Sequence, residues 1–219
     1  MSRILAISDI HSKYNALQKL LAGANYDPAS DELVLLGDYI DRGEDPVKTL
    51  ELVMSLKKGG ATVLMGNHEA MYLEAIEDID AGKDSIDNFY GDPNGCYGTL
   101  KEFHNNGLEK AAVEFFSGLP MKHRIGNKIF VHAGYNPDVD YAVQSQFNLL
   151  WTREPFLRAK IPDSCLIIFG HTPTQWNNFY IWHGANKIGI DCGAAYGGRL
   201  ACLELRDDGE GTEYYVECT

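Results

Sequence analysis

Six side chains that can bind metal ions follow short apolar runs of the chain. The runs span residues 4–7, 33–36, 62–65, 128–131 and 166–169. The side chains after them are Asp9, His11, Asp38, Asn67, His132 and His171. Apolar runs of this length predict buried strands, and the carboxyl ends of strands in an α/β sheet converge on one crevice. We therefore expect these six residues, distant in sequence, to meet at one rim.

The chemistry of this set favours a pair of first-row metal ions. The donors are oxygen and nitrogen atoms without a thiolate, which suits manganese, iron or zinc better than magnesium or calcium alone. Six ligands exceed the needs of one ion, whereas two ions would use them all if Asp38 bridged the pair. Two divalent cations, two carboxylates and one hydroxide leave a charge of about +1, which favours a phosphate ligand.

The elements that must position these residues alternate along the chain. Further strands are predicted at residues 187–190, 200–205 and 213–216, as a closing meander with a turn at 207–209. Helices are predicted at residues 14–22, 46–58, 71–81, 99–105 and 108–116. The alternation indicates an α/β fold. We expect one domain over residues 1–219, with a helical insert at about 71–118.

The composition excludes several classes of protein. The 219 residues are 45% hydrophobic and 23% charged, which is typical of a globular chain and not of a disordered one. A net charge of -12 repels phosphate backbones and anionic lipid, so neither a nucleic-acid polymer nor a membrane is an expected partner. The five cysteines form no CxxC pair, and the apolar run at residues 4–7 is too short for a signal-peptide core. We therefore expect a cytoplasmic protein with reduced thiols.

Five short motifs carry a resemblance to a known family. In chain order they are Asp9-Ile10-His11, GDYIDRG at residues 37–43, GNHE at 66–69, HAG at 132–134 and GH at 170–171. Their order and spacing, from Asp9 to Gly198, resemble those of the PPP-type calcineurin-like metallophosphoesterases. Within that family the chain is most similar to the short bacterial and phage serine/threonine protein phosphatases. The symmetrical diadenosine tetraphosphate hydrolases are the next most similar group.

The resemblance implies both a fold and a cofactor. The fold would be an αββα sandwich, in which helices flank two mixed sheets. The cofactor would be two divalent metal ions, with Mn²⁺ expected in vitro and iron or zinc as alternatives. One ion would be held by Asp9, His11 and Asp38, and the other by Asp38, Asn67, His132 and His171. A hydroxide that bridges the two ions would attack the phosphoester directly.

The resemblance also implies a set of catalytic residues. Asp41 would orient His68, while Arg42 and Arg153 would hold phosphate oxygens, Arg153 on the strength of a short match at residues 150–153. Because Asn67 and His68 are consecutive, a turn of Asn67 toward a metal would leave His68 free to face the leaving group. A carboxylate bonded to one ring nitrogen favours the imidazolium, so we expect His68 to be the general acid.

One position departs from the family pattern. The first motif of the family commonly reads GDxHG, whereas this chain has Ser8-Asp9-Ile10-His11-Ser12. Both candidate ligands are present, so the departure concerns the local turn and not the metals. Ser12 lacks the freedom that glycine has at positive φ.

These expectations lead to a metal-dependent phosphoester hydrolase. The main prediction is a serine/threonine protein phosphatase whose partner is a phosphoprotein or phosphopeptide. The alternative is a symmetrical diadenosine tetraphosphate hydrolase, which would use the same metals on a dinucleoside polyphosphate. A third hypothesis is a non-catalytic metal-binding scaffold. All six candidate ligands are present together with Asp41, Arg42 and His68, which argues against this hypothesis. A protein that has lost catalytic activity would be expected to have lost some of these residues.

Overall fold

Two mixed sheets form the centre of the molecule. The computed structural model describes residues 3–82, 94–206 and 211–218, and within them each sheet has five strands. The first sheet has the order β10-β9-β1-β2-β3 and the second the order β4-β5-β6-β8-β7. The strands of the first are β1 (Ile4–Ile7), β2 (Glu32–Leu35), β3 (Thr62–Val63), β9 (Arg199–Leu205) and β10 (Glu213–Glu217). Those of the second are β4 (Lys122–Ile125), β5 (Lys128–Val131), β6 (Leu166–Phe169), β7 (Trp182–Gly184) and β8 (Lys187–Gly189).

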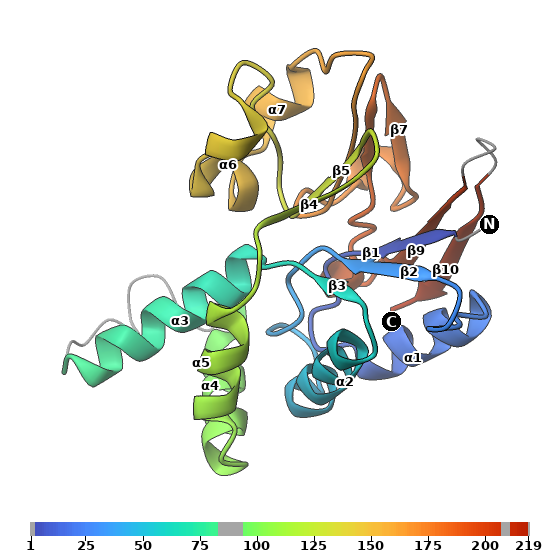
Figure 1. The fold of residues 1–219 in the computed structure, drawn as a ribbon. Coiled ribbons are helices and arrows are strands. Elements are labelled where there is room, and N and C mark those ends of the chain that lie inside the picture. The colour runs from blue at the N-terminus through green and yellow to red at the C-terminus, as the bar shows by residue number, and fades with distance from the viewer. Residues whose placement is uncertain (1–2, 83–93, 207–210, 219) are drawn as a thin grey trace.

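Helices flank the sheets, as the αββα prediction required (Figure 1). The helices α1 (Tyr14–Gly23) and α2 (Pro46–Lys58) lie along the first sheet, and α6 (Gln146–Leu150) and α7 (Glu154–Arg158) lie beside the second (Figure 1). A third group consists of α3 (Asn67–Asp80), α4 (Cys96–Asn105) and α5 (Glu109–Ser117). None of the helices in the described parts of the chain is long and apolar enough to cross a membrane.

The inner strands β1, β2, β5 and β6 are apolar on both faces because both faces are covered. In β1, Ile4 and Ala6 join the core between the two sheets, whereas Leu5 and Ile7 join the core beneath the helices. Successive side chains of a strand point to opposite faces, so a strand inside a sandwich needs a continuous apolar run. Each large aliphatic side chain buried in this way stabilises the fold by about 1.5–3 kcal/mol.

The predicted closing meander is wrong in its pairing. The strand β8 pairs with β6 and β7 in the second sheet, whereas β9 and β10 pair with each other in the first. An apolar run predicts a strand but not its partner, and here the chain changes sheets after β8. The turn predicted at 207–209 lies outside the described residues.

Two strands were not predicted, namely β4 and β7. Both are edge strands, and their sequences KHRI and WHG carry polar groups because neither is fully buried. An edge strand has one unpaired side and needs no continuous apolar run. The short helices α6 and α7 were also not predicted.

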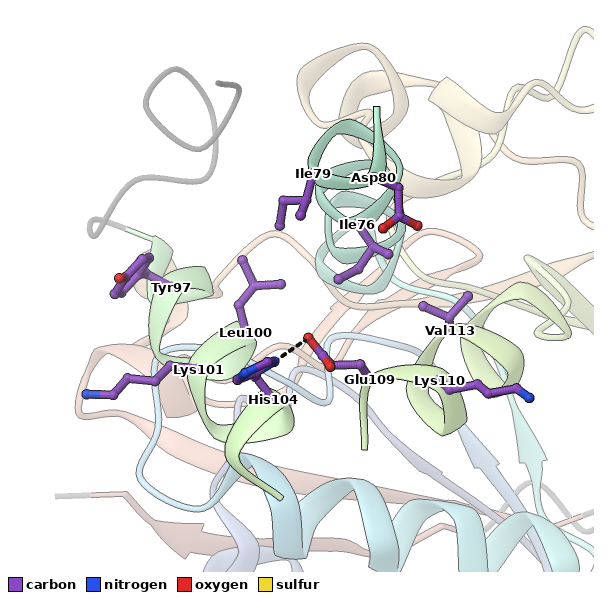
Figure 2. Close-up of a pocket in the computed structure, with 10 residues that line it drawn as sticks. All are labelled: Ile76, Ile79, Asp80, Tyr97, Leu100, Lys101, His104, Glu109, Lys110 and Val113. Carbon is purple, nitrogen blue, oxygen red and sulfur yellow. Dashed lines mark hydrogen bonds and ion pairs between the residues drawn. The ribbon is translucent and has the colours of Figure 1, made fainter. Parts of the chain in front are cut away.

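The described part of the predicted insert is helical. One aromatic ring from each of its helices meets in a small core: Tyr72 of α3 lies 5.5 Å from both Phe103 of α4 and Phe116 of α5, measured between ring centroids. On another side the same helices border an open hollow with a volume of about 630 Å³ (Figure 2). His104 and Glu109, which line it, form a hydrogen bond of 3.0 Å that links α4 to α5. Aromatic contacts in its interior and a polar contact at its surface therefore hold this group of three helices together.

Candidate metal centre

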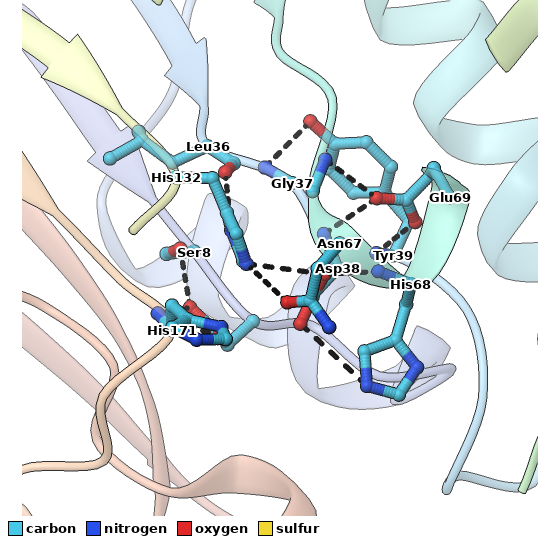
Figure 3. Close-up of polar contacts among 12 residues, drawn as sticks. Ser8, Leu36, Gly37, Asp38, Tyr39, Asn67, His68, Glu69, His132 and His171 are labelled. Atoms are coloured by element: carbon cyan, nitrogen blue, oxygen red, sulfur yellow. Dashed lines mark hydrogen bonds and ion pairs between the residues drawn. The ribbon is translucent and has the colours of Figure 1, made fainter. Parts of the chain in front are cut away.

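The six side chains predicted as ligands converge at the carboxyl ends of five strands. The loops after β1, β2, β5 and β6 and the first residue of α3, which follows β3, supply them. All six residues are buried. Figure 3 shows that four of them, Asp38, Asn67, His132 and His171, lie close together and near His68. Both sheets therefore contribute to one centre.

Asp38 lies between two clusters of possible ligand atoms. Its Oδ2 atom is 3.6 Å from His11 Nε2, and its Oδ1 atom is 3.4 Å from His132 Nε2. The clusters are His11, Asp38 and His68 on one side and Asp38, His132 and His171 on the other, each with ligand atoms within 4.8 Å of one another. Asp38 is the member that they share.

Backbone carbonyls set the orientation of two histidine rings. His11 Nδ1 is 3.0 Å from the carbonyl oxygen of Ile40, and His132 Nδ1 is 2.9 Å from that of Leu36. A carbonyl only accepts, so each Nδ1 must donate, and in a neutral ring Nε2 then carries the lone pair. His132 Nε2 in turn lies 2.8 Å from Asn67 Oδ1, which is also an acceptor. With a neutral His132 the contact would bring two acceptor atoms together, an arrangement that suits a cation bound to both.

The charges of the centre agree with this donor set. Burial alone would raise the pKa of Asp38, but the neighbouring histidines, His132 first, lower it below its ordinary value. Burial and the charge of His68 hold the pKa of His11 well below its usual range. Burial and the charge of His132 lower the pKa of His171 to about 3. An ionised carboxylate and neutral imidazoles are the forms that bind a metal.

Asp9 lies at the edge of the centre. Its carboxylate accepts hydrogen bonds from Ser8 Oγ at 2.5 Å and from the backbone amide of His171 at 2.9 Å. It belongs to neither of the two clusters around Asp38. Asp9 therefore ties the loop after β1 to the loop after β6.

His68 and Asp41 form a buried pair beside the ligands. His68 Nδ1 lies 2.6 Å from Asp41 Oδ2, and His68 Nε2 lies 3.9 Å from Asp38 Oδ2. Burial opposes protonation of His68, but the carboxylates of Asp38 and Asp41 raise its pKa above the ordinary value. A cationic imidazole next to the candidate ligands can donate a proton.

The two predicted phosphate-binding arginines are placed differently. Arg42 reaches the centre: its Nη1 is 3.3 Å from His11 Nε2, and its guanidinium lies 5.3 Å from the centroid of the Tyr196 ring. Arg153 is exposed at the start of α7, and its charge contributes to the low pKa of His171. The half-buried Arg42 thus contacts the centre directly, whereas Arg153 acts on it through electrostatics.

Strained backbone marks the loops of the centre. Seven non-glycine residues there have positive φ: Asp9, His11, Ser12, Asp38, Asp41, Arg42 and His171. Such conformations cost of order 1–3 kcal/mol each and cluster at functional sites. Ser12, which stands where the family commonly has glycine, adopts a φ of 55° and donates its amide to the carbonyl of Tyr39. The turn therefore keeps a left-handed conformation in spite of the serine side chain.

The sequence did not reveal three residues that support the centre. Glu69 accepts hydrogen bonds from the backbone amides of Gly66, Asp38 and Tyr39, which joins the start of α3 to the loop after β2. Its place three residues after Gly66 is that of a capping-box glutamate, a signal that could have indicated this role. Cys96 and Thr99 of α4 donate to Asp41, and nothing in their sequence context pointed to that contact.

Comparison with known proteins bears on this geometry. The model of the calcineurin-like phosphoesterase family matches residues 2–200. Serine/threonine-protein phosphatase 1 of Salmonella typhimurium is 30% identical over 212 residues, which cover 93% of this chain and 92% of that protein. A symmetrical bis(5'-nucleosyl)-tetraphosphatase of Glaesserella parasuis is 30% identical over 175 residues, which cover 78% of this chain and 58% of that protein.

Solved structures share the fold. A putative diadenosine tetraphosphatase superposes with a TM-score of 0.70 at 22% identity, covering 97% of this chain and 93% of its own. A serine/threonine phosphatase from Saccharomyces cerevisiae superposes with a TM-score of 0.67 at 15% identity, covering 100% of this chain and 80% of its own. The family model spans all five loops that build the centre, from Asp9 to His171. On that match, this chain belongs to the calcineurin-like phosphoesterase family.

Proposed function

We propose that this protein is a two-metal phosphatase that removes phosphate from serine or threonine side chains of proteins. The observation that carries the proposal is the position of Asp38, whose oxygens face His11 on one side and His132 on the other. A carboxylate shared by two ligand clusters would be suited to hold two divalent ions, the kind of site that two-metal hydrolases use.

The six convergent residues would hold the two ions. One would be bound by Asp9, His11 and Asp38, and the other by Asp38, Asn67, His132 and His171. The low pKa values of His11 and His171, the ionised Asp38 and the contact of His132 Nε2 with Asn67 Oδ1 support this assignment. We propose Mn²⁺ for reconstitution, with iron and zinc as alternatives, because the donors are oxygen and nitrogen. Bound divalent ions supply Lewis-acid chemistry that lowers the pKa of a water molecule and offsets phosphoryl charge.

The remaining chemistry falls to four residues of the chain. Arg42 would bind phosphoryl oxygens through its planar guanidinium, which already lies next to His11. Arg153 would add a second positive charge from the rim. His68 would donate a proton to the leaving oxygen from Nε2, the nitrogen on the side of Asp38. Asp41 would hold Nδ1 and so keep the ring in that orientation.

The coverage of the relatives favours a phosphoprotein substrate. The match to the protein phosphatase of Salmonella typhimurium covers 92% of that protein, whereas the match to the tetraphosphatase covers 58%. Hydrolysis of a dinucleoside polyphosphate is the second candidate function, because the tetraphosphatase is equally similar in sequence where the two align. We also propose a cytoplasmic location, in which the five free thiols would stay reduced.

A substrate panel with metal analysis tests the proposal. Protein reconstituted with Mn²⁺ should bind two ions per chain and hydrolyse phosphoserine peptides faster than diadenosine tetraphosphate. Asp38→Asn should lose metal and activity together. One ion per fully active chain would contradict the two-metal assignment. A preference for diadenosine tetraphosphate would make the protein a tetraphosphatase. Turnover of neither substrate would favour the hypothesis of a non-catalytic metal-binding scaffold.

A further inference from the structure

Among the residues that the structure describes, three side chains donate hydrogen bonds to the carboxylate of Asp41. His68 Nδ1 and Cys96 Sγ lie 2.6 Å and 3.1 Å from its Oδ2 atom. Thr99 Oγ1 lies 2.5 Å from its Oδ1 atom. All four residues are buried, so solvent is poorly placed to replace any of these donors. Two of the three donors belong to α4, which lies in the predicted insert.

The contact from Thr99 fixes the direction of the carboxylate. The terminal torsion of an aspartate is broad, so the backbone alone does not determine where Oδ2 points. A carboxylate is planar, and a hydrogen bond that holds Oδ1 therefore also fixes Oδ2, the atom that faces His68. Removing the Thr99 hydroxyl would leave Oδ1 buried without this donor, and the carboxylate would rotate to find another.

The start of α4 is built against the loop that carries Asp41. Gly95 has a φ of 74°, and a Cβ atom there would lie 2.4 Å from the backbone nitrogen of Arg42, so only glycine allows this approach. Cys96 and Thr99 are three residues apart and lie on the same face of the helix. The Asn94 side chain accepts a hydrogen bond of 3.5 Å from Arg42. The insert therefore contacts both Asp41 and Arg42 through the first turn of α4 and the two residues before it.

We propose that Thr99 is a positioning residue, which directs Asp41 onto His68 and thereby makes proton donation by His68 efficient. The proposal rests on the proposed role of His68 as general acid. It gives the insert a function in the chemical step, through α4, in addition to any part in substrate binding. Thr99 itself would touch neither substrate nor metal.

The decisive variant is Thr99→Val, which replaces the hydroxyl by a methyl group of similar size. Thr49→Val is the matched control, because Thr49 is also a fully buried threonine and its hydroxyl has no hydrogen-bond partner among the described residues. For Mn²⁺-loaded protein we expect Thr99→Val to slow phosphoserine peptide hydrolysis about tenfold, a part of the 10²–10⁴ that a positioned acid contributes. Hydrolysis of p-nitrophenyl phosphate should change less than about twofold, because its leaving group needs little protonation. Thr49→Val should alter neither rate.

A second readout is independent of turnover. The Nδ1 proton of His68, in a short hydrogen bond to Asp41, should give a downfield proton NMR signal in the full chain loaded with diamagnetic Zn²⁺. Its assignment comes from its loss in His68→Asn. Thr99→Val should shift or broaden this signal, and Thr49→Val should leave it in place. If Thr99→Val does not fold, the pair Thr99→Ser and Thr99→Ala decides, because only the serine keeps the hydroxyl and should keep wild-type behaviour.

The outcomes separate this inference from the proposed function. Equal losses on both substrates in Thr99→Val, or an unchanged His68 signal, would overturn the positioning role. If His68→Asn itself slows both substrates equally, the general-acid proposal fails first. If Thr99→Val matches Thr49→Val while His68→Asn shows the substrate difference, only the role of Thr99 is wrong.

Discussion

His68 Nδ1 lies 2.6 Å from Asp41 Oδ2, and both side chains are almost completely buried. The hydrogen bond occupies one ring nitrogen, which leaves Nε2 free on the side of Asp38. The two carboxylates raise the pKa of His68 against the effect of burial, so the imidazolium persists to higher pH than in a free histidine. This pairing makes His68 a proton donor and not a metal ligand in our proposal.

The first prediction concerns His68→Asn. We expect hydrolysis of phosphoserine peptides to slow by about 10²–10⁴, the usual contribution of a positioned general acid. Hydrolysis of p-nitrophenyl phosphate should slow much less, because a serine alkoxide is far more basic than p-nitrophenolate. Steady-state kinetics with both substrates and metal analysis of the same samples provide the measurement. Equal losses would assign His68 to phosphate positioning, and loss of metal would make it a ligand.

The second prediction concerns the guanidinium of Arg42. It lies between His11 Nε2, the Asn94 side chain and the ring of Tyr196, which a planar group can contact simultaneously. Lysine keeps the charge but not the fork, so Arg42→Lys should lose at least one charge-assisted hydrogen bond to phosphate. A loss of about 1.5–3 kcal/mol corresponds to a fall in kcat/KM of about 10–150-fold.

The control for Arg42→Lys is Arg158→Lys. Arg158 is an exposed residue of α7 that pairs with Glu154, and the same exchange there should leave kcat/KM unchanged. Inhibition by inorganic phosphate should weaken in Arg42→Lys and not in the control. Full activity and unchanged phosphate inhibition in Arg42→Lys would remove this arginine from the phosphate site.

The convergence of the six candidate ligands could be predicted because each follows a buried strand. Strand ends meet at one edge whatever the order of the strands, so Asp38 and His132 come together although they lie in different sheets. The pairing of the strands could not be predicted, because the alternation of β1 between two cores gives no sign of which strand lies beside it. The ligand roles themselves stay predictions.

The contact of Thr99 with Asp41 could not be predicted from the sequence, for a different reason. The two residues are 58 positions apart, and Thr99 occupies a buried face of α4. Helical periodicity indicates which face is buried but not which polar group it meets. A buried threonine such as Thr49, whose hydroxyl has no partner among the described residues, looks the same in sequence.

The third prediction concerns the stability contributed by Lys187. This buried lysine of β8 donates hydrogen bonds to the carbonyl oxygens of Phe156, Leu157 and Ala159, at 3.0, 2.7 and 2.7 Å, and so caps the end of α7. Lys187→Met would remove this donor from all three carbonyls, and of the three only that of Phe156 keeps a backbone donor among the described residues, the amide of Ala159. We expect the free energy of unfolding to fall by about 2–4 kcal/mol in urea titrations at fixed metal loading. The exposed Lys19→Met should change it by less than about 0.5 kcal/mol, and a similar small change in Lys187→Met would show that solvent caps the helix equally well.

The last prediction returns to Ser12, where the chain departs from its family. Its φ of 55° is one that glycine adopts freely, and its hydroxyl is buried without a hydrogen-bond partner among the described residues. Glycine would remove both costs, of about 1–2 kcal/mol for the left-handed backbone and at least about 1 kcal/mol for the hydroxyl. It would also enlarge the freedom of the unfolded chain, which offsets about 0.5–1 kcal/mol.

We therefore expect Ser12→Gly to raise the free energy of unfolding by at least about 1 kcal/mol, or the unfolding midpoint by at least about 2–4 °C, at fixed metal loading. Ser12→Ala separates the two causes, because alanine lacks the hydroxyl but keeps a Cβ atom at positive φ, and it should gain less than glycine. The glycine of Ser12→Gly keeps the amide that donates to Tyr39, so the loop that carries His11 should keep its shape and the metal content its value. A destabilised Ser12→Gly would mean that the serine side chain has a partner that holds this loop, and that the departure from the family pattern is compensated within the centre.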